Sequence, residues 1–321
     1  MSGLAFLRSN LEIDFFGINK SESLLAAALS SFTMRSLTKA QIGLVLLLSS
    51  LAWLTDQIHP LSSNNALAEL ETSSIDNGVG NGADQGRALI EQGLSAQEQG
   101  KYREAIAIWH LFLSANPNNP AAYNSLGNAH AALGQVDRAE AAYRNAIRVS
   151  PNSATSHYNL GTLLAKQQRI EAAIAAFQAA VRINPEDADA YYNIGFWQTQ
   201  QGRLDEAETA YLRALEITPN DVEIHYTLGV FYRTRNQIDK AEIAFRQVVE
   251  LDNKNVDGYH YLSRTLIDQN RLREAEQILR SGLRQVPSSA NLYHDLAIVL
   301  HRQGRIAEAQ TMYEQAILRG S

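Results

Sequence analysis

The stretch AYYNIGFWQTQQGRLDEAETAYLRALEITPN, residues 190–220, decides the fold. Tyr191, Ile194 and Gln198 fall on one side of a 3.6-residue period and predict a first helix, which Gly202 breaks. A second apolar stripe follows at Leu204, Ala207, Tyr211 and Ala214. Pro219 ends the second helix, because proline removes a hydrogen-bond donor and clashes with the preceding turn.

The features of this stretch recur every 34 residues. Alanine occupies positions 105, 139, 173, 207, 241, 275 and 309. Proline occupies positions 117, 151, 185, 219 and 287, and Asn253 fills the gap. An aromatic residue recurs at Trp109, Tyr143, Phe177, Tyr211, Phe245 and Tyr313, with Leu279 completing the series. Such a fixed period indicates stacked repeats, since one helical hairpin cannot bury its apolar faces alone.

This pattern resembles the tetratricopeptide repeat family. The family's motif is followed most closely at Tyr123, Leu126, Gly127, Ala139, Tyr143, Ala146 and Pro151. Seven units fit, beginning at Gly86, Pro120, Ala154, Ala188, Val222, Val256 and Ala290. The sixth unit departs most, with Ser263, Leu279 and Gly282 where glycine, an aromatic residue and alanine are expected. The resemblance implies an all-α, right-handed superhelical solenoid with first helices on the concave face and second helices on the convex face.

Small residues are expected where the two helices of a unit approach each other. Gly195 and Ala207 are such positions in the quoted unit, and a larger side chain there would overpack the core at a cost of about 1–3 kcal/mol.

The N-terminal 85 residues have another character. Ile42 to Leu54 is apolar and uncharged, but it is shorter than the ~20 residues of a membrane span. Arg35 and Lys39 precede it, and Ala66-Leu67-Ala68 follows as a small-x-small site, so the pattern predicts a secretory signal peptide with translation from Met34. The expected organisation is an extension at 1–33 that is not translated, a signal peptide at 34–68, a flexible linker at 69–85 and repeats at 86–321. An uncleaved membrane anchor is the alternative.

Composition and motifs exclude several classes of function. The net charge of −6 does not favour nucleic acid, and the absence of cysteine excludes disulfides and thiolate chemistry. Catalytic and phosphate-binding motifs are missing, and the repeats leave no room for a catalytic domain, so we expect a non-enzymatic protein without cofactor or metal.

In the family, positions 2, 5, 6, 9, 12 and 13 of each first helix commonly face the groove. On this basis the predicted partner-binding residues are Asn124, Asn128, Tyr158, Asn159, Tyr192, Asn193, Phe196, Tyr226, His260 and His294. Tyrosine offers apolar area with a polar tip, and asparagine can bond both groups of an extended backbone. Because these side chains are expected to face the groove, replacing Tyr192 and Asn193 should barely change stability. Tyr and Asn are also simply favoured by the family at these positions.

Some family members clamp a C-terminal carboxylate with two asparagines and three cations. In the best register this sequence has Asn128 and Asn159 for the asparagines, but Asn124, Asp189 and Asn193 stand where cations are needed. Such binding is therefore disfavoured.

The leading hypothesis is a protein-binding scaffold or assembly factor in the periplasm or an equivalent lumen, holding an extended segment of a client protein. The first alternative is a metal-delivery chaperone that uses His260, His294 and His301, since His and Asp bind Mn²⁺ or Zn²⁺. The second is an accessory protein of a carbohydrate or secretion system. The last helix also carries apolar residues, Tyr313, Ala316 and Ile317, on the edge that a further unit would cover, which indicates docking on a partner or self-association.

Overall fold

The structure is a computed structural model that describes residues 81–320. Within this range the chain forms fourteen α-helices and no strand, so the all-α prediction is confirmed. The described residues all belong to one compact unit. The predicted extension, signal peptide and most of the linker lie outside the described residues. No described helix is both long and apolar enough to cross a bilayer.

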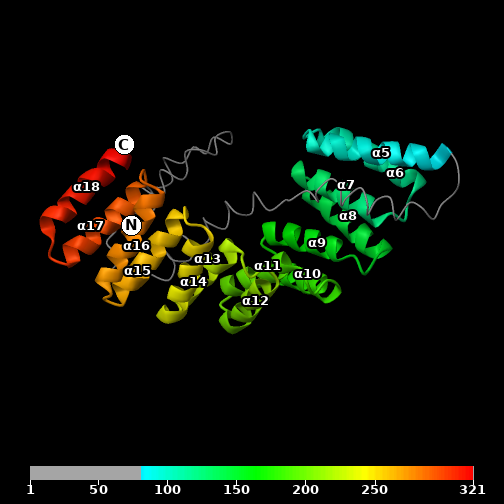
Figure 1. The fold of residues 1–321 in the computed structure, drawn as a ribbon. Helices are drawn as coiled ribbons and strands as arrows, with labels where there is room; N and C mark the ends of the chain where they lie inside the picture. Colours follow the sequence, from blue (N-terminus) through cyan, green and yellow to red (C-terminus); the bar gives the residue numbers. More distant parts are fainter. Residues whose placement is uncertain (1–80, 321) are drawn as a thin grey trace, which may run out of the picture. The chain divides into compact units, whose positions relative to one another are not determined.

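The helices alternate as first and second members of seven hairpins (Figure 1). The first helices are α5 (Asn81–Glu98), α7 (Pro120–Ala132), α9 (Ala154–Lys166), α11 (Ala188–Gln200), α13 (Val222–Thr234), α15 (Val256–Asp268) and α17 (Ala290–Arg302). The second helices are α6 (Tyr102–Ala115), α8 (Val136–Val149), α10 (Ile170–Ile183), α12 (Leu204–Ile217), α14 (Ile238–Leu251), α16 (Leu272–Gln285) and α18 (Ile306–Gly320). The first helices from α7 onward begin at the expected residues, whereas α5 begins at Asn81 rather than at Gly86.

Capping residues explain where the first helices start. The side chain of Asp221 accepts hydrogen bonds from the backbone N–H groups of Glu223 and Ile224 at the start of α13. The equivalent side chains of Asn119, Ser153, Asp187, Asn255 and Ser289 cap the other first helices from α7 onward. Each cap satisfies an N–H group that has no partner within its helix.

A residue with positive φ ends each first helix. Gly202 takes this conformation at φ 73°, which glycine adopts without steric cost. Gln168, Asn236 and Asn270 take it at φ 58° to 59° without that freedom. The chain then turns directly into the second helix, so the connection between the two helices of each hairpin is short.

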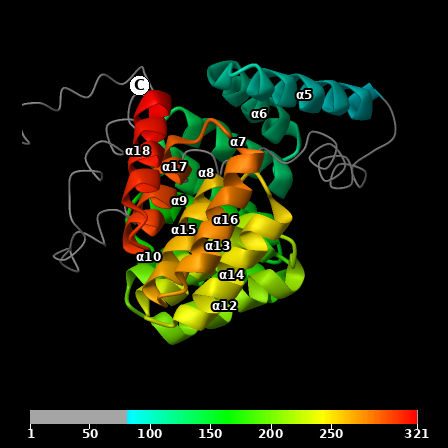
Figure 2. The same cartoon turned by 60° about the vertical axis from the view of Figure 1, so that its left-hand side comes forward.

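The core consists of the apolar faces within and between hairpins. Gly195 allows the close approach that the sequence predicts, since a Cβ atom there would lie 2.8 Å from Cδ1 of Tyr211. In the divergent sixth unit Ser263 and Leu279 are fully buried, and Gly282 makes room for Tyr259 and Leu292. That unit therefore keeps the same packing with different residues. Figure 2 shows the second helices α12, α14 and α16 next to one another.

Candidate functional site

The candidate site is the face of the first helices, which we call the first-helix face. It is defined by positions 2, 5, 6, 9, 12 and 13 of each unit, where position 1 is the first residue of helices α7 to α17.

Side chains at position 5 of one unit contact side chains at position 6 of the next. The Tyr192 hydroxyl lies 3.0 Å from Oγ1 of Thr227, 35 residues further along the chain. The Asn193 amide donates to the Tyr158 hydroxyl at 3.4 Å over the same separation. We call these contacts between first helices rungs, and they connect α9 with α11 and α11 with α13.

Two further rungs lie toward the C-terminal units. The rings of Tyr226 and Tyr261 meet edge to face with centroids 5.5 Å apart. His260 Nδ1 lies 2.5 Å from Oδ2 of Asp295, whose side chain is 2% exposed. The rungs therefore join consecutive first helices from α9 to α17.

Tyr192 and Asn193 are structural residues. They are only 9% and 5% exposed, and the Tyr192 ring packs edge to face on Tyr211 at 5.7 Å. Burial is the main cause that raises the pKa of Tyr192, and the neighbouring Tyr211 raises it further. The hydroxyl of Tyr192 therefore stays protonated. The premise that this pair faces the groove is wrong, because both side chains are buried between units, and replacing them is therefore expected to lower stability.

The asparagines of the second unit are also engaged. Asn124 is 4% exposed and donates through Nδ2 to Oγ of Ser156 at 2.9 Å, while its Oδ1 has no hydrogen-bond partner among the described residues. Oδ1 of Asn128 accepts from the Tyr143 hydroxyl at 2.7 Å. Asn124 thus connects the second unit to the third, and Asn128 connects the two helices of the second unit.

Other predicted residues remain accessible on the first-helix face. Asn159 on α9 is partly exposed, and its side chain makes no hydrogen bond to any described residue. Phe196 on α11 is partly exposed, with its ring edge-on to Trp197 at 4.9 Å. Tyr158 and Tyr226 are partly exposed as well. Asn159 therefore offers a carboxamide that can still accept and donate hydrogen bonds. Phe196 offers part of an apolar ring, and both residues lie beside the rung between Tyr158 and Asn193.

The C-terminal histidines do not form a cluster. His260 is engaged by Asp295, whereas His294 is exposed and contacts Tyr313 edge to face at 5.7 Å. His301 is exposed on the next turn but one. Across residues 81–320, no group of three or more His, Cys, Asp or Glu side chains could hold a metal ion.

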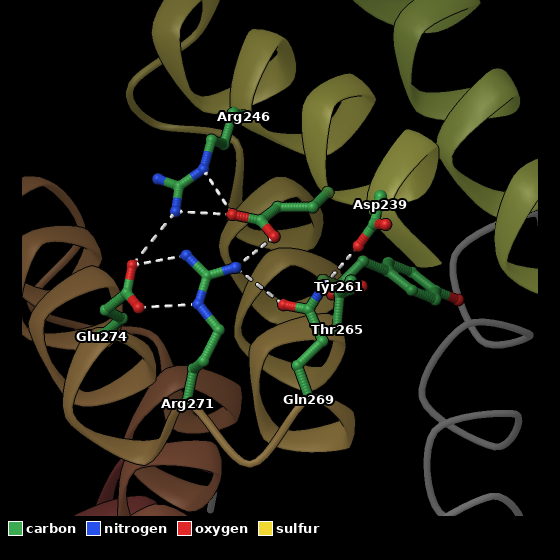
Figure 3. Close-up of polar contacts among 8 residues, drawn as sticks. Asp239, Arg246, Tyr261, Thr265, Gln269, Arg271 and Glu274 are labelled. Carbon is green, nitrogen blue, oxygen red and sulfur yellow. Dashed lines mark hydrogen bonds and ion pairs between the residues drawn. The ribbon is translucent and has the colours of Figure 1, made fainter. Parts of the chain in front are cut away.

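An ion-pair network that the sequence pattern did not predict connects the second helices (Figure 3). Glu242 on α14 accepts from Arg246 in its own helix and from Arg271 at the start of the next second helix. Arg271 also bonds Glu274 at 2.6 Å and Gln269 at 2.8 Å. Burial alone would raise the pKa of Glu242, but the hydrogen bonds from the two arginines outweigh it and the pKa is lowered.

Equivalent glutamates receive cations from the next unit at three other places. Glu140 pairs with Arg169, Glu208 with Arg235 and Lys240, and Glu276 with Arg305. The 34-residue spacing of glutamates 208, 242 and 276 is the sequence signal that could have revealed them. These contacts connect consecutive units on the side of the second helices, as the rungs connect them on the side of the first helices.

Comparisons with known proteins agree with this fold. A family model described as the Cilia and flagella-associated protein 70 C-terminal domain, a tetratricopeptide repeat model, matches residues 44–294. A second, described as Tetratricopeptide repeat, matches residues 289–319. The chain therefore belongs to the tetratricopeptide repeat proteins. No curated protein matches it.

Solved structures show the same architecture. The C-terminal part of a tetratricopeptide repeat protein from Cytophaga hutchinsonii is 19% identical, with a TM-score of 0.60 over 70% of this chain and 93% of that one. PilF of Pseudomonas aeruginosa is 19% identical, with a TM-score of 0.54 over 66% of this chain and 97% of that one. MamA is 27% identical over 51% of this chain and 96% of that one, with a TM-score of 0.48. The first two likenesses show the fold, and an all-α repeat solenoid of this family is a protein-binding scaffold in its general class.

Proposed function

We propose that the chain binds an extended segment of a partner protein on the first-helix face across α9, α11 and α13. The observation that carries this proposal is the position of Asn159 and Phe196, which stay accessible beside side chains that are locked by rungs. A rigid surface loses little conformational freedom on binding, so most of its contact energy appears as affinity.

The two accessible residue types suit an extended backbone. The Asn159 carboxamide carries both donors and acceptors, so it can bond a peptide N–H and a peptide C=O. Phe196 offers an apolar surface for a side chain of the same segment, as aromatic anchors do at interface centres. An extended segment exposes its backbone groups and turns every second side chain to the same face. It can therefore bond Asn159 through its backbone and contact Phe196 through a side chain at the same time.

We further propose that the protein acts outside the cytoplasm. The support is the sequence pattern of Arg35, Lys39, the apolar run from Ile42 to Leu54 and the site at 66–68. N-terminal sequencing of the mature protein should give Glu69 as the first residue. A cytoplasmic protein that retains Met34 would contradict export, and a membrane-bound protein that retains it would favour the anchored alternative.

The partner can be identified by photo-crosslinking in the producing cell. A photoreactive phenylalanine analogue placed at Phe196 should capture the partner covalently. The matched control is the same analogue at Ile243, which is 66% exposed on the second helix α14. A discrete adduct at 196 that is absent at 243 supports the proposal. Adducts at 243 alone would move the binding site to the second helices.

The two alternative functions gain no further support. A metal-delivery role lacks a group of ligands within the described residues, because His260 is bonded to Asp295 and His294 packs on Tyr313. A role in carbohydrate handling or secretion has no feature of its own in this fold. Both remain alternatives to the proposed binding of a partner segment.

A further inference from the structure

Position 9 of the first helices forms a row along the first-helix face. On α11, α13, α15 and α17 its members are Phe196, Val230, Arg264 and Ile298, and all four are partly exposed. The equivalent residues on α7 and α9, Asn128 and Thr162, are uncharged. From α11 to α17 the row therefore consists of three apolar residues and one cation.

Arg264 lies on the accessible side of α15. The residues of this helix that are not buried after its first residue are Asp257, His260, Tyr261, Arg264 and Asp268. His260, Arg264 and Asp268 follow one another at intervals of four residues, so they share one side of the helix. Arg264 is therefore on the same side as the rung that His260 forms with α17.

No carboxylate of the described chain neutralises Arg264. Its side chain makes no hydrogen bond or ion pair with a described residue. Asp268, one turn later, pairs with Arg233 at 3.1 Å, and the buried Asp295 is bonded to the histidine of its rung. Asp257 lies seven residues earlier, about 10 Å along the helix axis. The guanidinium is thus available for a carboxylate of a partner.

A segment that lies along this row would cover Arg264. Covering the guanidinium with an apolar side chain removes its water without replacing the hydrogen bonds, which is unfavourable. A carboxylate replaces them with charge-assisted hydrogen bonds, which are among the strongest in proteins. Arg264 therefore favours a carboxylate and disfavours an apolar side chain, whereas Val230 and Ile298 on either side favour apolar side chains.

The spacing of the row determines the spacing of side chains in such a segment. Packed helices, such as those that the rungs connect, lie about 8–10 Å apart. A polyproline II segment has three residues per turn and rises about 3.1 Å per residue, so every third side chain returns to the same side after about 9 Å. In a β-strand, residues three apart point to opposite faces. Polyproline II is therefore the extended conformation whose side chains match the row, and its backbone groups are equally open to Asn159.

We propose that the partner segment continues along position 9 of α13, α15 and α17 in a polyproline II conformation and places a carboxylate against Arg264. Apolar side chains three residues before and three residues after that Asp or Glu contact Val230 and Ile298. A further apolar side chain, three residues beyond the one at Val230, contacts Phe196. The inference rests on the proposed function and specifies its ligand, a segment with one acidic residue among apolar residues at intervals of three, in either chain direction.

Selection from a random peptide library displayed on phage tests the carboxylate. The immobilised full chain should enrich peptides with Asp or Glu flanked by apolar residues three positions away on both sides. Arg264→Glu should enrich Lys or Arg at the same place. Arg284→Glu is the matched control, because Arg284 is exposed on α16, makes no ion pair with a described residue and changes the net charge equally. An acidic preference that survives Arg264→Glu, or that Arg284→Glu also reverses, would overturn the proposal.

Calorimetry with a peptide of the enriched sequence measures the size of the effect. The acidic peptide should bind the wild type roughly 10-fold or more tightly than a version with the neutral amide in its place, and Arg264→Gln should abolish this difference. Arg264→Gln should melt as the wild type does, since its side chain has no partner to lose. One residue inserted between the acidic and an apolar residue should weaken binding roughly 10-fold. Unchanged affinity after the insertion would contradict the three-residue spacing.

The outcomes with Phe196→Ser distinguish a failure of this inference from a failure of the proposed function. Peptides that bind Phe196→Ser more weakly than the wild type but show no acidic preference would overturn the inference and leave binding at the first-helix face intact. Peptides that bind both proteins equally, or a library from which nothing is enriched, would contradict binding at that face and the inference with it.

Discussion

The Tyr192 hydroxyl lies 3.0 Å from Oγ1 of Thr227, so position 5 of one unit is bonded to position 6 of the next. This relationship makes Tyr192 part of the packing between units rather than a side chain held ready for a partner. Its equivalents Tyr158 and His260 are joined to the following units at the same separation of 35 residues.

Tyr192→Ala should therefore destabilise the array. It removes a ring that is 9% exposed and packs on Tyr211, and such truncations cost about 3 kcal/mol or more. Tyr192→Phe keeps the ring and loses only the hydrogen bond, with an expected cost of about 1 kcal/mol. Urea unfolding of the three proteins measures both. An Ala variant as stable as the wild type would show that the rung carries no packing energy.

Gly195→Ala should destabilise the fourth unit although alanine favours helices. The added Cβ would lie 2.8 Å from Cδ1 of Tyr211, and overpacking of this kind costs about 1–3 kcal/mol. Gly86→Ala is the matched control, since its Cβ would meet Phe112 at an ordinary 3.8 Å. The control should be neutral or stabilised by up to about 1 kcal/mol, as helix propensity predicts. Thermal melts that rank the two variants in the opposite order would refute the close approach.

The network around Glu242 should make the array sensitive to acid. The pKa of Glu242 lies below its ordinary value of 4.5, so its stabilising contribution is present above that value and is lost as the pH falls through the lowered pKa. Melting temperatures measured between about pH 6 and pH 3 should therefore drop less in Glu242→Gln than in the wild type.

Glu314→Gln is the control for this pH series, because Glu314 is exposed and makes no ion pair with a described residue. Its melting temperature should follow the wild-type curve. If Glu242→Gln also follows that curve, the ion pairs with Arg246 and Arg271 contribute nothing to stability.

Much of the fold could be predicted from periodicity, because every unit solves the same packing problem with the same spacing. The starts of the first helices from α7 onward follow from capping residues such as Asp221, which the repeat places at a fixed offset. The small residue at Gly195 is equally local, since its neighbour Tyr211 is only 16 residues away.

The site was harder to predict, because exposure depends on contacts between units. Periodicity places Tyr192 and Phe196 on the same helix side, yet one is 9% exposed and the other is partly exposed. The Tyr192 ring packs on Tyr211 of its own unit, and its hydroxyl meets Thr227 of the following unit, a contact that no pattern within one unit reveals. The pairing of Glu242 with Arg271 was missed for the same reason.

Whether the first-helix face binds a partner is tested most directly by affinity. Once crosslinking at 196 has identified a partner segment, its dissociation constant should be measured for the wild type, Phe196→Ser and Ile243→Ser. The account predicts that Phe196→Ser weakens binding roughly 30-fold or more while Ile243→Ser binds as the wild type does. Equal affinity of all three folded proteins would contradict the assignment of binding to this face.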